Sequence, residues 1–138
     1  MRALATDRPA RPISPHLTHV RWPIGMMVSI IHRITGDGMA LVGTLLLVWW
    51  LAALASGPAS YETFQWLFGT WIHGVLGYII GVGLTFSLFQ HIASGIRHLV
   101  MDTGAGYELK TNRTMAWMTL VGSSTATILF WAYLLGGK

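Results

Sequence analysis

The stretch GMALVGTLLLVWWLAALA, residues 38–55, contains eighteen consecutive positions without a charged side chain. A helix needs about 20 predominantly apolar residues to cross the hydrocarbon core of a bilayer. Immediately before it, SIIHRITGD at residues 29–37 places a histidine, an arginine and an aspartate within six positions. The sequence therefore predicts a membrane-spanning helix that begins in a cluster of ionisable side chains.

The remainder of the chain is equally apolar. Of 138 residues, 53% are hydrophobic and only 10% are charged, whereas soluble domains contain about 25% charged residues. Stretches that lack Asp, Glu, Lys and Arg cover residues 38–61, 63–96 and 114–137. We therefore expect an all-α integral membrane protein, a single membrane-anchor domain over residues 1–138, with transmembrane helices at about 24–55, 71–100 and 114–136. No separate soluble domain fits beside three crossings, and we expect no nucleic-acid partner.

An irregular N-terminal arm is expected over residues 1–23. Prolines at positions 9, 12, 15 and 23 are incompatible with a regular helix there. The apolar stretch that follows is longer than the core of a signal peptide, which is about 7–15 residues. We therefore expect a retained first helix. The prolines at positions 9, 12 and 15 also oppose the amphipathic helix of a mitochondrial presequence.

The distribution of basic residues predicts the orientation. Several arginines lie at or before the start of the first helix, and Arg97, Lys110 and Arg113 flank the loop expected at residues 101–113. The loop expected at residues 56–70 contains no Lys or Arg. Because basic loops remain on the cytoplasmic side, the N-terminus and the second loop should face the cytoplasm or matrix.

The first polar group within the apolar segments contains Ser29, His32 and Arg33. Spacings of three and four residues place them on one helical face, and Gly25 and Gly36 extend that face so that another group can approach the backbone. Serine and arginine can hydrogen-bond a carbonyl oxygen, and arginine stabilises negative charge that develops there. The pattern thus favours a site for a polar ligand head at the membrane surface. The alternative is a snorkelling arginine and an interfacial histidine.

The second polar group contains His91 and His98, which lie two helical turns apart with Gly95 between them. His91 is about 9 Å deeper in the membrane than the arginine at position 97, at 1.5 Å per residue. Histidine is a common axial ligand of haem iron, and Gly95 leaves room for a flat macrocycle. The alternative is a hydrogen bond between helices. His32, the intrachain candidate for a second axial ligand, is better placed for a propionate or an ordered water, so that ligand is expected from another subunit. The absence of cysteine excludes iron–sulfur ligation from this chain.

Other features carry no assigned role. His73, near the opposite surface, is expected to be an ordinary interfacial residue. Gly77 and Gly81 form a spacing that is typical of helix packing. Asp37 lies four residues beyond Arg33 and is placed to neutralise it.

Three stretches together resemble a known family. They are RPISPHL at residues 11–17, RWPIGMMVSIIHRITG at 21–36 and HIASGIRHLVMD at 91–102. In order, spacing and position on the expected helices they resemble the cytochrome b subunit, the large membrane anchor, of succinate dehydrogenase (complex II). They cover about a quarter of the chain, and the remainder matches the family in topology.

The resemblance implies a complex of four subunits. A flavoprotein oxidises succinate, an iron–sulfur protein passes the electrons on, and two small membrane anchors bind haem b and form the ubiquinone site. By the same resemblance His91 is the axial ligand of the haem iron, and the second anchor subunit provides the other ligand. Ser29 and Arg33 match the serine and arginine of the quinone site, with Ile30 and Trp22 beside the quinone. The aromatic residue at the position of Trp22 varies in the family.

The resemblance also extends to the surroundings of the haem. His32 matches a histidine near the propionates, and Arg33 is placed to contact them too. His98 and Asp102 fit the third motif, His98 being expected in the haem region and Asp102 having no assigned role.

The expected function is therefore electron transfer from succinate to ubiquinone, within the respiratory chain and the tricarboxylic acid cycle. The chain would contribute binding, orientation and electrostatics, as the non-flavin subunit of an enzyme. We expect the inner membrane of a bacterium in preference to that of a mitochondrion. The alternatives are an anchor of a quinol:fumarate reductase and a non-redox membrane scaffold, which would be colourless. A transporter subunit is disfavoured, because the chain contains no internal repeat.

Overall fold

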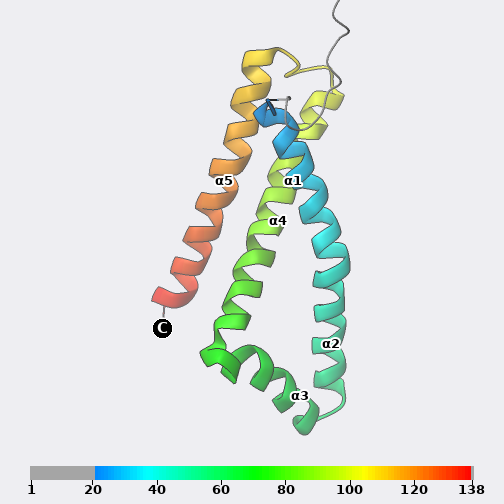
Figure 1. Cartoon of the computed structure of the whole chain (residues 1–138), viewed down its shortest axis with the longest axis vertical. Helices are drawn as coiled ribbons and strands as arrows, with labels where there is room; N and C mark the ends of the chain where they lie inside the picture. Colours follow the sequence, from blue (N-terminus) through cyan, green and yellow to red (C-terminus); the bar gives the residue numbers. More distant parts are fainter. Residues whose placement is uncertain (1–20, 138) are drawn as a thin grey trace, which may run out of the picture.

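The computed structural model of the chain describes residues 21–137. Most of the expected arm, residues 1–20, lies outside the described residues. Over the described part the chain is helical, and three of its helices are long and apolar enough to cross a membrane, at Ile24–Ala55, Val75–Asp102 and Leu109–Gly136. The predicted all-α architecture with three spanning helices is confirmed (Figure 1).

The first spanning helix has three parts. Helix α1 (Ile24–Gly38) is followed by a π-helical turn at Met39–Gly43 and then by α2 (Thr44–Ala55). Pro23 precedes α1, and its carbonyl oxygen accepts hydrogen bonds from the amides of Met26 and Met27 at 3.0 and 3.2 Å. Proline suits this place because the first amides of a helix have no intrahelical acceptor.

The segment expected as a loop at residues 56–70 is instead largely helical. It contains α3 (Pro58–Gln65) and a π-helical turn at Trp66–Thr70, and a 3₁₀ turn follows at Trp71–Gly74. The Gly57–Pro58 pair reverses the chain, because Gly57 has a φ of 99° and Pro58 begins the next helix. Aromatic rings then anchor α3, with the centroid of Phe64 5.3 Å from that of Trp49.

The second and third spanning helices also differ from their expected bounds. Helix α4 (Val75–Asp102) begins four residues later than predicted, after Gly74 at a φ of 75°. Helix α5 (Leu109–Gly136) begins five residues earlier than predicted. The charged residues within 109–113 favour a loop before the expected helix. A helix can nevertheless extend beyond the hydrocarbon core, where charged side chains are solvated.

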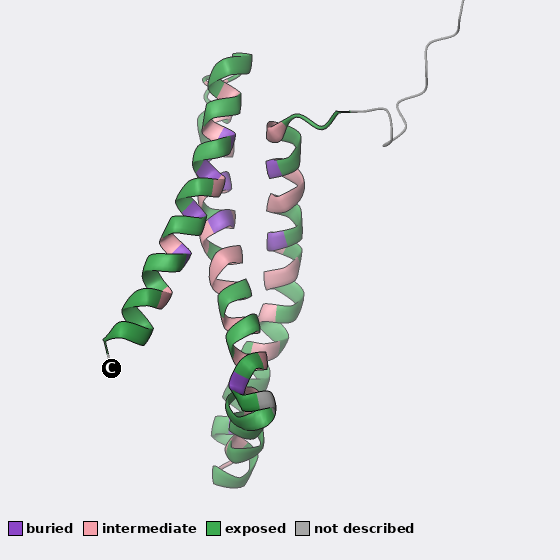
Figure 2. Ribbon diagram, turned by 60° about the vertical axis from the view of Figure 1, so that its left-hand side comes forward, coloured by how far each residue is buried: buried purple, intermediate pink, exposed green. Residues whose placement is uncertain are grey.

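Helix α4 lies in the middle of the molecule (Figure 1). It packs against α1 and α5 at the end where α1 begins, and α2 and α5 diverge towards the other end. The buried positions are concentrated in the half that contains α1 (Figure 2). Most of them are polar: Thr35, Gln90, Ser94, Arg97, Thr119, Ser123 and Thr127. Large apolar side chains face outwards, as a lipid or subunit environment requires.

The interface between α4 and α5 centres on a buried polar pair. The hydroxyl of Ser123 donates to Oε1 of Gln90 at 2.5 Å, and both residues are almost fully buried. The Nε2 atom of Gln90 is buried without a hydrogen-bond partner. This pair replaces apolar packing with a directional contact in the centre of the molecule.

Substitution Ser123→Ala is expected to lower the stability of the protein by about 1–2 kcal/mol, because Oε1 of Gln90 is then also left without a donor. Thermal unfolding of the purified protein in mild detergent measures this effect. The matched control is Ser124→Ala, one position along α5 and exposed, which should leave the melting temperature unchanged. Equal melting temperatures for the two variants would contradict the importance of the pair.

Candidate functional site

Two of the predicted site histidines lie face to face between α1 and α4. The ring centroids of His32 and His91 are 3.9 Å apart, with an angle of 9° between the ring planes. The ring of His98 lies 5.1 Å from that of His32. His32 therefore links the deeper His91 to the shallower His98, and three imidazoles from two helices form one cluster.

Glycine allows the helices to approach at this point. A Cβ atom placed on Gly36 would lie only 2.8 Å from Cε1 of His91, so the ring of His91 occupies the space that a side chain would take. A Cβ atom on Gly95 would lie 3.9 Å from Cε1 of His32, which is an ordinary contact. The close approach of the two helices thus depends on Gly36 in particular.

Hydrogen bonds fix both rings. Nδ1 of His32 lies 2.6 Å from Oγ of Ser94, a fully buried side chain whose hydroxyl donates to the carbonyl of Gln90 at 2.7 Å. Nδ1 of His91 lies 3.1 Å from the backbone carbonyl oxygen of His32. Because a carbonyl only accepts, Nδ1 of His91 carries the hydrogen in this contact and Nε2 keeps its lone pair. Thr35 also donates to the carbonyl of His32, at 3.0 Å.

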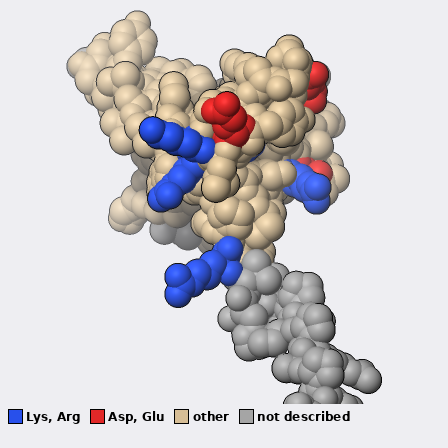
Figure 3. Space-filling model, turned by 90° about the horizontal axis from the view of Figure 1, so that it is seen from above, with Lys and Arg blue, Asp and Glu red and all other residues tan. Residues whose placement is uncertain are grey.

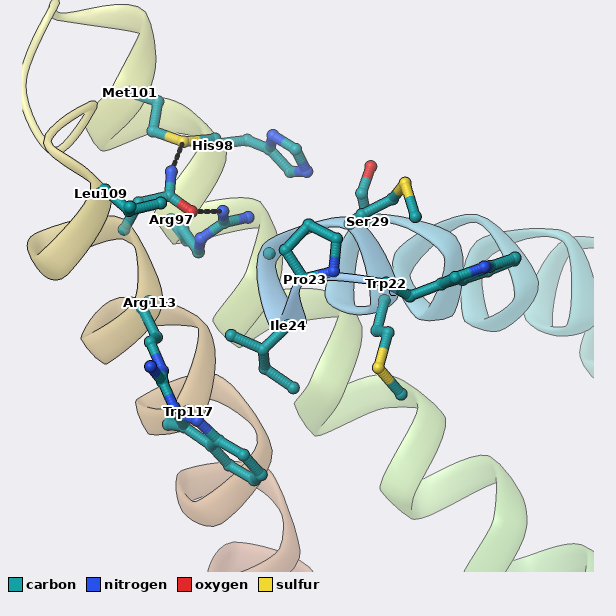
Figure 4. A pocket seen from close by; sticks show the side chains of 14 residues that line it. Trp22, Pro23, Ile24, Ser29, Arg97, His98, Met101, Leu109, Arg113 and Trp117 are labelled. Atoms are coloured by element: carbon teal, nitrogen blue, oxygen red, sulfur yellow. Dashed lines mark hydrogen bonds between the residues drawn. The ribbon is translucent and has the colours of Figure 1, made fainter. Parts of the chain in front are cut away.

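A pocket of about 780 Å³ lies beside this cluster, between the start of α1, the end of α4 and the start of α5 (Figure 4). Its polar lining includes Ser29, Arg97, His98, Asn112 and Arg113, and its apolar lining includes Trp22, Pro23, Ile24, Met101 and Trp117. The structure therefore brings Trp22, Ser29 and His98 together around one space.

Two predicted quinone-site residues do not line this pocket. Ile30 is half-buried on α1, and Arg33 is exposed. Ser29 lines the pocket and His32 turns towards α4, whereas Arg33 is exposed.

The pocket also contains two residues that sequence reasoning missed. The side chain of Arg97 is 5% exposed, and its Nη2 donates to Oδ1 of Asn112 at 2.9 Å. Nδ2 of Asn112 lies 3.4 Å from the sulfur of Met101. A Cβ atom on Gly25 would lie 2.6 Å from Oδ1 of Asn112. The signal for Arg97 was an arginine inside an apolar helix; Asn112 gave none, because it fell within an expected loop.

Positive charge gathers at the end that contains the pocket. All Lys and Arg residues within 21–137 lie in the half formed by α1, the end of α4 and the start of α5: Arg21, Arg33, Arg97, Lys110 and Arg113. Figure 3 views the molecule from this end and shows basic side chains spread around it. The acidic residues Asp37, Asp102 and Glu108 lie in the same half and are exposed, whereas Glu62 lies on α3 at the other end.

The remaining polar features lie away from the cluster. His73 is exposed in the turn before α4, at the opposite end of the molecule, and has a positive φ of 57°. Gly77 and Gly81 are packing positions within the chain. A Cβ atom on Gly77 would overlap the carbonyl oxygen of Phe68, and one on Gly81 would lie 3.0 Å from the ring of Trp131.

Over residues 7–130 the chain matches the family described as "Succinate dehydrogenase/Fumarate reductase transmembrane subunit". The chain belongs to this family. Among succinate dehydrogenase subunits, it is 34% identical over 123 residues to the cytochrome b556 subunit of Paracoccus denitrificans. The matched residues make up 89% of this chain and 91% of that protein. The chain is 33% identical over 121 residues to the cytochrome b556 subunit of Rickettsia conorii, covering 88% and 90%.

A mitochondrial succinate dehydrogenase subunit is also similar. The cytochrome b560 subunit of Sus scrofa is 39% identical over 97 residues, which are 70% of this chain and 55% of that protein. The family resemblance inferred from three short stretches is thus confirmed and extends over most of the chain. Like its relatives, the chain is a transmembrane subunit of a succinate:quinone oxidoreductase and not the flavin-bearing chain.

Proposed function

We propose that this chain is the cytochrome b anchor of a succinate:ubiquinone oxidoreductase, which binds haem b together with a second anchor subunit and forms part of the ubiquinone-reduction site. The observation that carries the proposal is His91. His91 belongs to a spanning helix. Nδ1 of its ring donates a hydrogen bond to a backbone carbonyl, so Nε2 keeps its lone pair. Relatives named cytochrome b556 and b560 support the same function.

The residues around His91 fit a haem group. A metal-ligating histidine usually donates its second nitrogen to a carbonyl or carboxylate, which fixes the tautomer and the ring orientation, and the carbonyl of His32 provides this contact. His91 is the proposed axial ligand, while His32, Arg33 and His98 are proposed to surround the haem and its propionates. When bound, haem b exchanges single electrons.

A partner subunit is proposed to supply the other axial ligand. The rings of His32 and His91 are stacked in parallel with their centroids 3.9 Å apart, which leaves no space for a haem between them, so His91 alone would hold the iron from this chain. Nδ1 of His32 is moreover engaged by Ser94. Within the described residues His32 therefore serves His91 as a neighbour that fixes its orientation.

The pocket beside the cluster is the proposed place of the ubiquinone head. Ser29 lines it and can donate a hydrogen bond to a quinone carbonyl, while Trp22 forms part of the apolar wall. Ile30 and Arg33 are assigned to this site by family resemblance. Arg33 lies one turn beyond Ser29, where its charge raises the local positive potential and favours the reduced, more negative forms of the quinone.

The orientation and partners follow from the charges. We place the pocket end on the cytoplasmic side, because basic residues gather there, and we expect the flavoprotein and iron–sulfur subunits to dock at this end. The exposed apolar flanks face lipid and the second anchor subunit. The bacterial inner membrane is preferred over the mitochondrial one, because the subunits of the bacteria Paracoccus denitrificans and Rickettsia conorii match 89% and 88% of this chain.

A quinol:fumarate reductase is the second candidate, because the family description names both enzymes. The direction of electron flow depends on cofactors in other chains. Comparing turnover with succinate and with fumarate distinguishes the two.

The decisive experiment is purification of the complex in mild detergent, with identification of the co-purifying chains and a visible spectrum. The expected result is a low-spin b-type spectrum together with a flavoprotein, an iron–sulfur protein and a second small membrane subunit. A colourless preparation without these chains would indicate a membrane scaffold instead.

Substitution Ser29→Ala is expected to reduce succinate–ubiquinone turnover by about tenfold or more, since a lost hydrogen bond of about 1.5 kcal/mol corresponds to that factor. Reduction of an artificial dye by the same complex should be unchanged, because it bypasses the quinone site. Ser60→Ala, on α3 at the opposite end, is the matched control. Arg33→Ala should act in the same direction as Ser29→Ala, and full turnover in both variants would refute the quinone assignment.

A further inference from the structure

Ser94 connects the histidine cluster to the backbone of α4. It lies three residues after His91 on this helix, its exposed fraction is 0%, and it does not line the pocket that contains Ser29. Its Oγ atom is 2.6 Å from Nδ1 of His32 on α1, which is short for a hydrogen bond between nitrogen and oxygen. A buried hydroxyl of α4 thus makes a close contact with an imidazole of the neighbouring helix.

The hydrogen of the Ser94 hydroxyl is engaged within α4. A serine hydroxyl has one hydrogen to donate and two lone pairs. It donates to the carbonyl oxygen of Gln90 at 2.7 Å, one turn back on the helix, and the carbonyl oxygen of His91 lies further away at 3.3 Å. Oγ therefore meets the imidazole with a lone pair, and Nδ1 of His32 donates the hydrogen of this contact. Ser94 in this way fixes the position of that hydrogen and the plane of the His32 ring.

His32 is held at its backbone as well as at its ring. Its carbonyl oxygen accepts hydrogen bonds from Nδ1 of His91 at 3.1 Å and from the hydroxyl of Thr35 at 3.0 Å. The two helices consequently hold one another's imidazoles. Ser94 of α4 holds the ring that comes from α1, and a carbonyl of α1 holds the ring that comes from α4.

The orientation of His32 matters to His91 because the two rings are stacked. Their centroids are 3.9 Å apart and their planes differ by 9°, so a turn of one ring requires a turn of the other. A Cβ atom on Gly36 would lie 2.8 Å from Cε1 of His91, and the backbone of α1 therefore also borders this ring. Of the groups on α1 that surround the His91 ring, the His32 side chain is one that can rotate, and Ser94 prevents that rotation.

We propose that Ser94 is a positioning residue for the haem ligand: by holding the ring of His32, it fixes the plane of the His91 imidazole. This inference rests on the proposed function, in which His91 is the axial ligand of the iron, and adds a residue that acts on the ligand through its neighbour. Outer partners of metal-ligating histidines commonly fix the orientation of the ring. A hydrogen bond to its own helix, the ordinary role of serine in a membrane helix, would need no partner on α1.

The test uses the complete membrane complex and the EPR spectrum of its oxidised low-spin haem. The g values of such a haem depend on the relative orientation of its two axial ring planes. Ser94→Ala is expected to shift and broaden the lowest-field g value, because His32 loses its hydrogen bond and the His91 ring adopts more orientations. Haem content per complex should remain unchanged, since the ligand itself is intact. An unchanged EPR signal in the assembled variant would overturn the proposal.

Thr85→Val is the matched control. The hydroxyl of Thr85 also donates to a carbonyl one turn back on α4, that of Gly81, at 2.7 Å, and this is its one side-chain hydrogen bond within the described residues. The substitution removes the same kind of local bond without touching His32, so the g values should match those of the unmodified complex. Equal shifts in the two variants would trace the change to α4 itself and contradict a role through His32.

His32→Phe provides a second test, which decides the matter even if Ser94→Ala fails to assemble. Phenylalanine keeps a ring that can stack on His91 but cannot donate to Ser94. We expect a shifted and broadened signal here too, and an unchanged signal would refute the proposal. Adding Ser94→Ala to His32→Phe should cause no further shift, because both substitutions remove the same contact. Additive shifts would show that Ser94 does not act through His32.

The outcomes separate this inference from the function on which it rests. If the unmodified complex shows a low-spin b-type haem that is lost in His91→Leu, while Ser94→Ala leaves the EPR signal unchanged, the proposed function stands and only the role of Ser94 fails. If the unmodified complex contains no such haem, both proposals fail.

Discussion

Replacing His91 by leucine is expected to abolish the low-spin b-type spectrum of the purified complex. Leucine has a similar volume but no nitrogen, so the proposed haem would lose its axial ligand from this chain. The visible spectrum of the complex, normalised to protein, measures the loss. His73→Asn is the control, because His73 is exposed at the opposite end and asparagine tolerates its positive φ of 57°.

In the His91→Leu variant, His32 could bind the haem iron in place of His91 and preserve the spectrum. Its ring lies 3.9 Å from that of His91, so among residues 21–137 it is the histidine best placed to replace a lost ligand. A spectrum that survives in His91→Leu but disappears when His32→Leu is added would identify such a replacement. A normal spectrum in the double variant would contradict the assignment of His91.

Substitution Gly36→Val is expected to have the next largest effect. Its Cβ atom would lie 2.8 Å from Cε1 of His91, and that ring cannot move freely, since it is stacked on His32 and hydrogen-bonded through Nδ1. Overpacking of this kind costs about 1–3 kcal/mol, and relief requires α1 and α4 to separate. We expect a lower melting temperature and a reduced haem content in the purified complex.

Gly38→Val is the matched control for this substitution. It lies two residues further along the same helix, and a Cβ atom there would meet nothing within 4 Å. The two variants share the same change in helix propensity and apolar area, so any difference between them reports the contact with His91. Equal stability and haem content would show that the two helices do not need glycine at position 36.

Much of the fold could be predicted because a bilayer imposes simple requirements. Backbone amides inside lipid must be satisfied within a helix, so three long uncharged segments indicated three helices. The same argument failed outside the membrane. The segment at residues 56–70, whose one charged residue is Glu62, was expected to be a loop but folds into α3 and a π-helical turn. Polar residues 109–113 continue α5 beyond the apolar segment.

The candidate site, too, could be predicted from the sequence only in part. Helical spacing alone placed His91 and His98 on one face of α4, and both approach His32 in the structure. Spacing also placed Arg33 one turn from Ser29 on α1; in the structure Arg33 is exposed, and Arg97 from α4 lines the pocket together with Ser29. Periodicity gives the angle between residues on one helix but not the neighbour that each face meets.

The sequence by itself determined the class of protein, its three membrane crossings and, through three short stretches, its family. Only the tertiary structure decided that His32 stacks on His91 and that Asn112 holds Arg97 beside the pocket. These contacts join different helices, and their distances depend on how closely the helices pack. Gly25 and Gly36 set that closeness, because the space for the contacting side chains exists only where the backbone carries no Cβ atom.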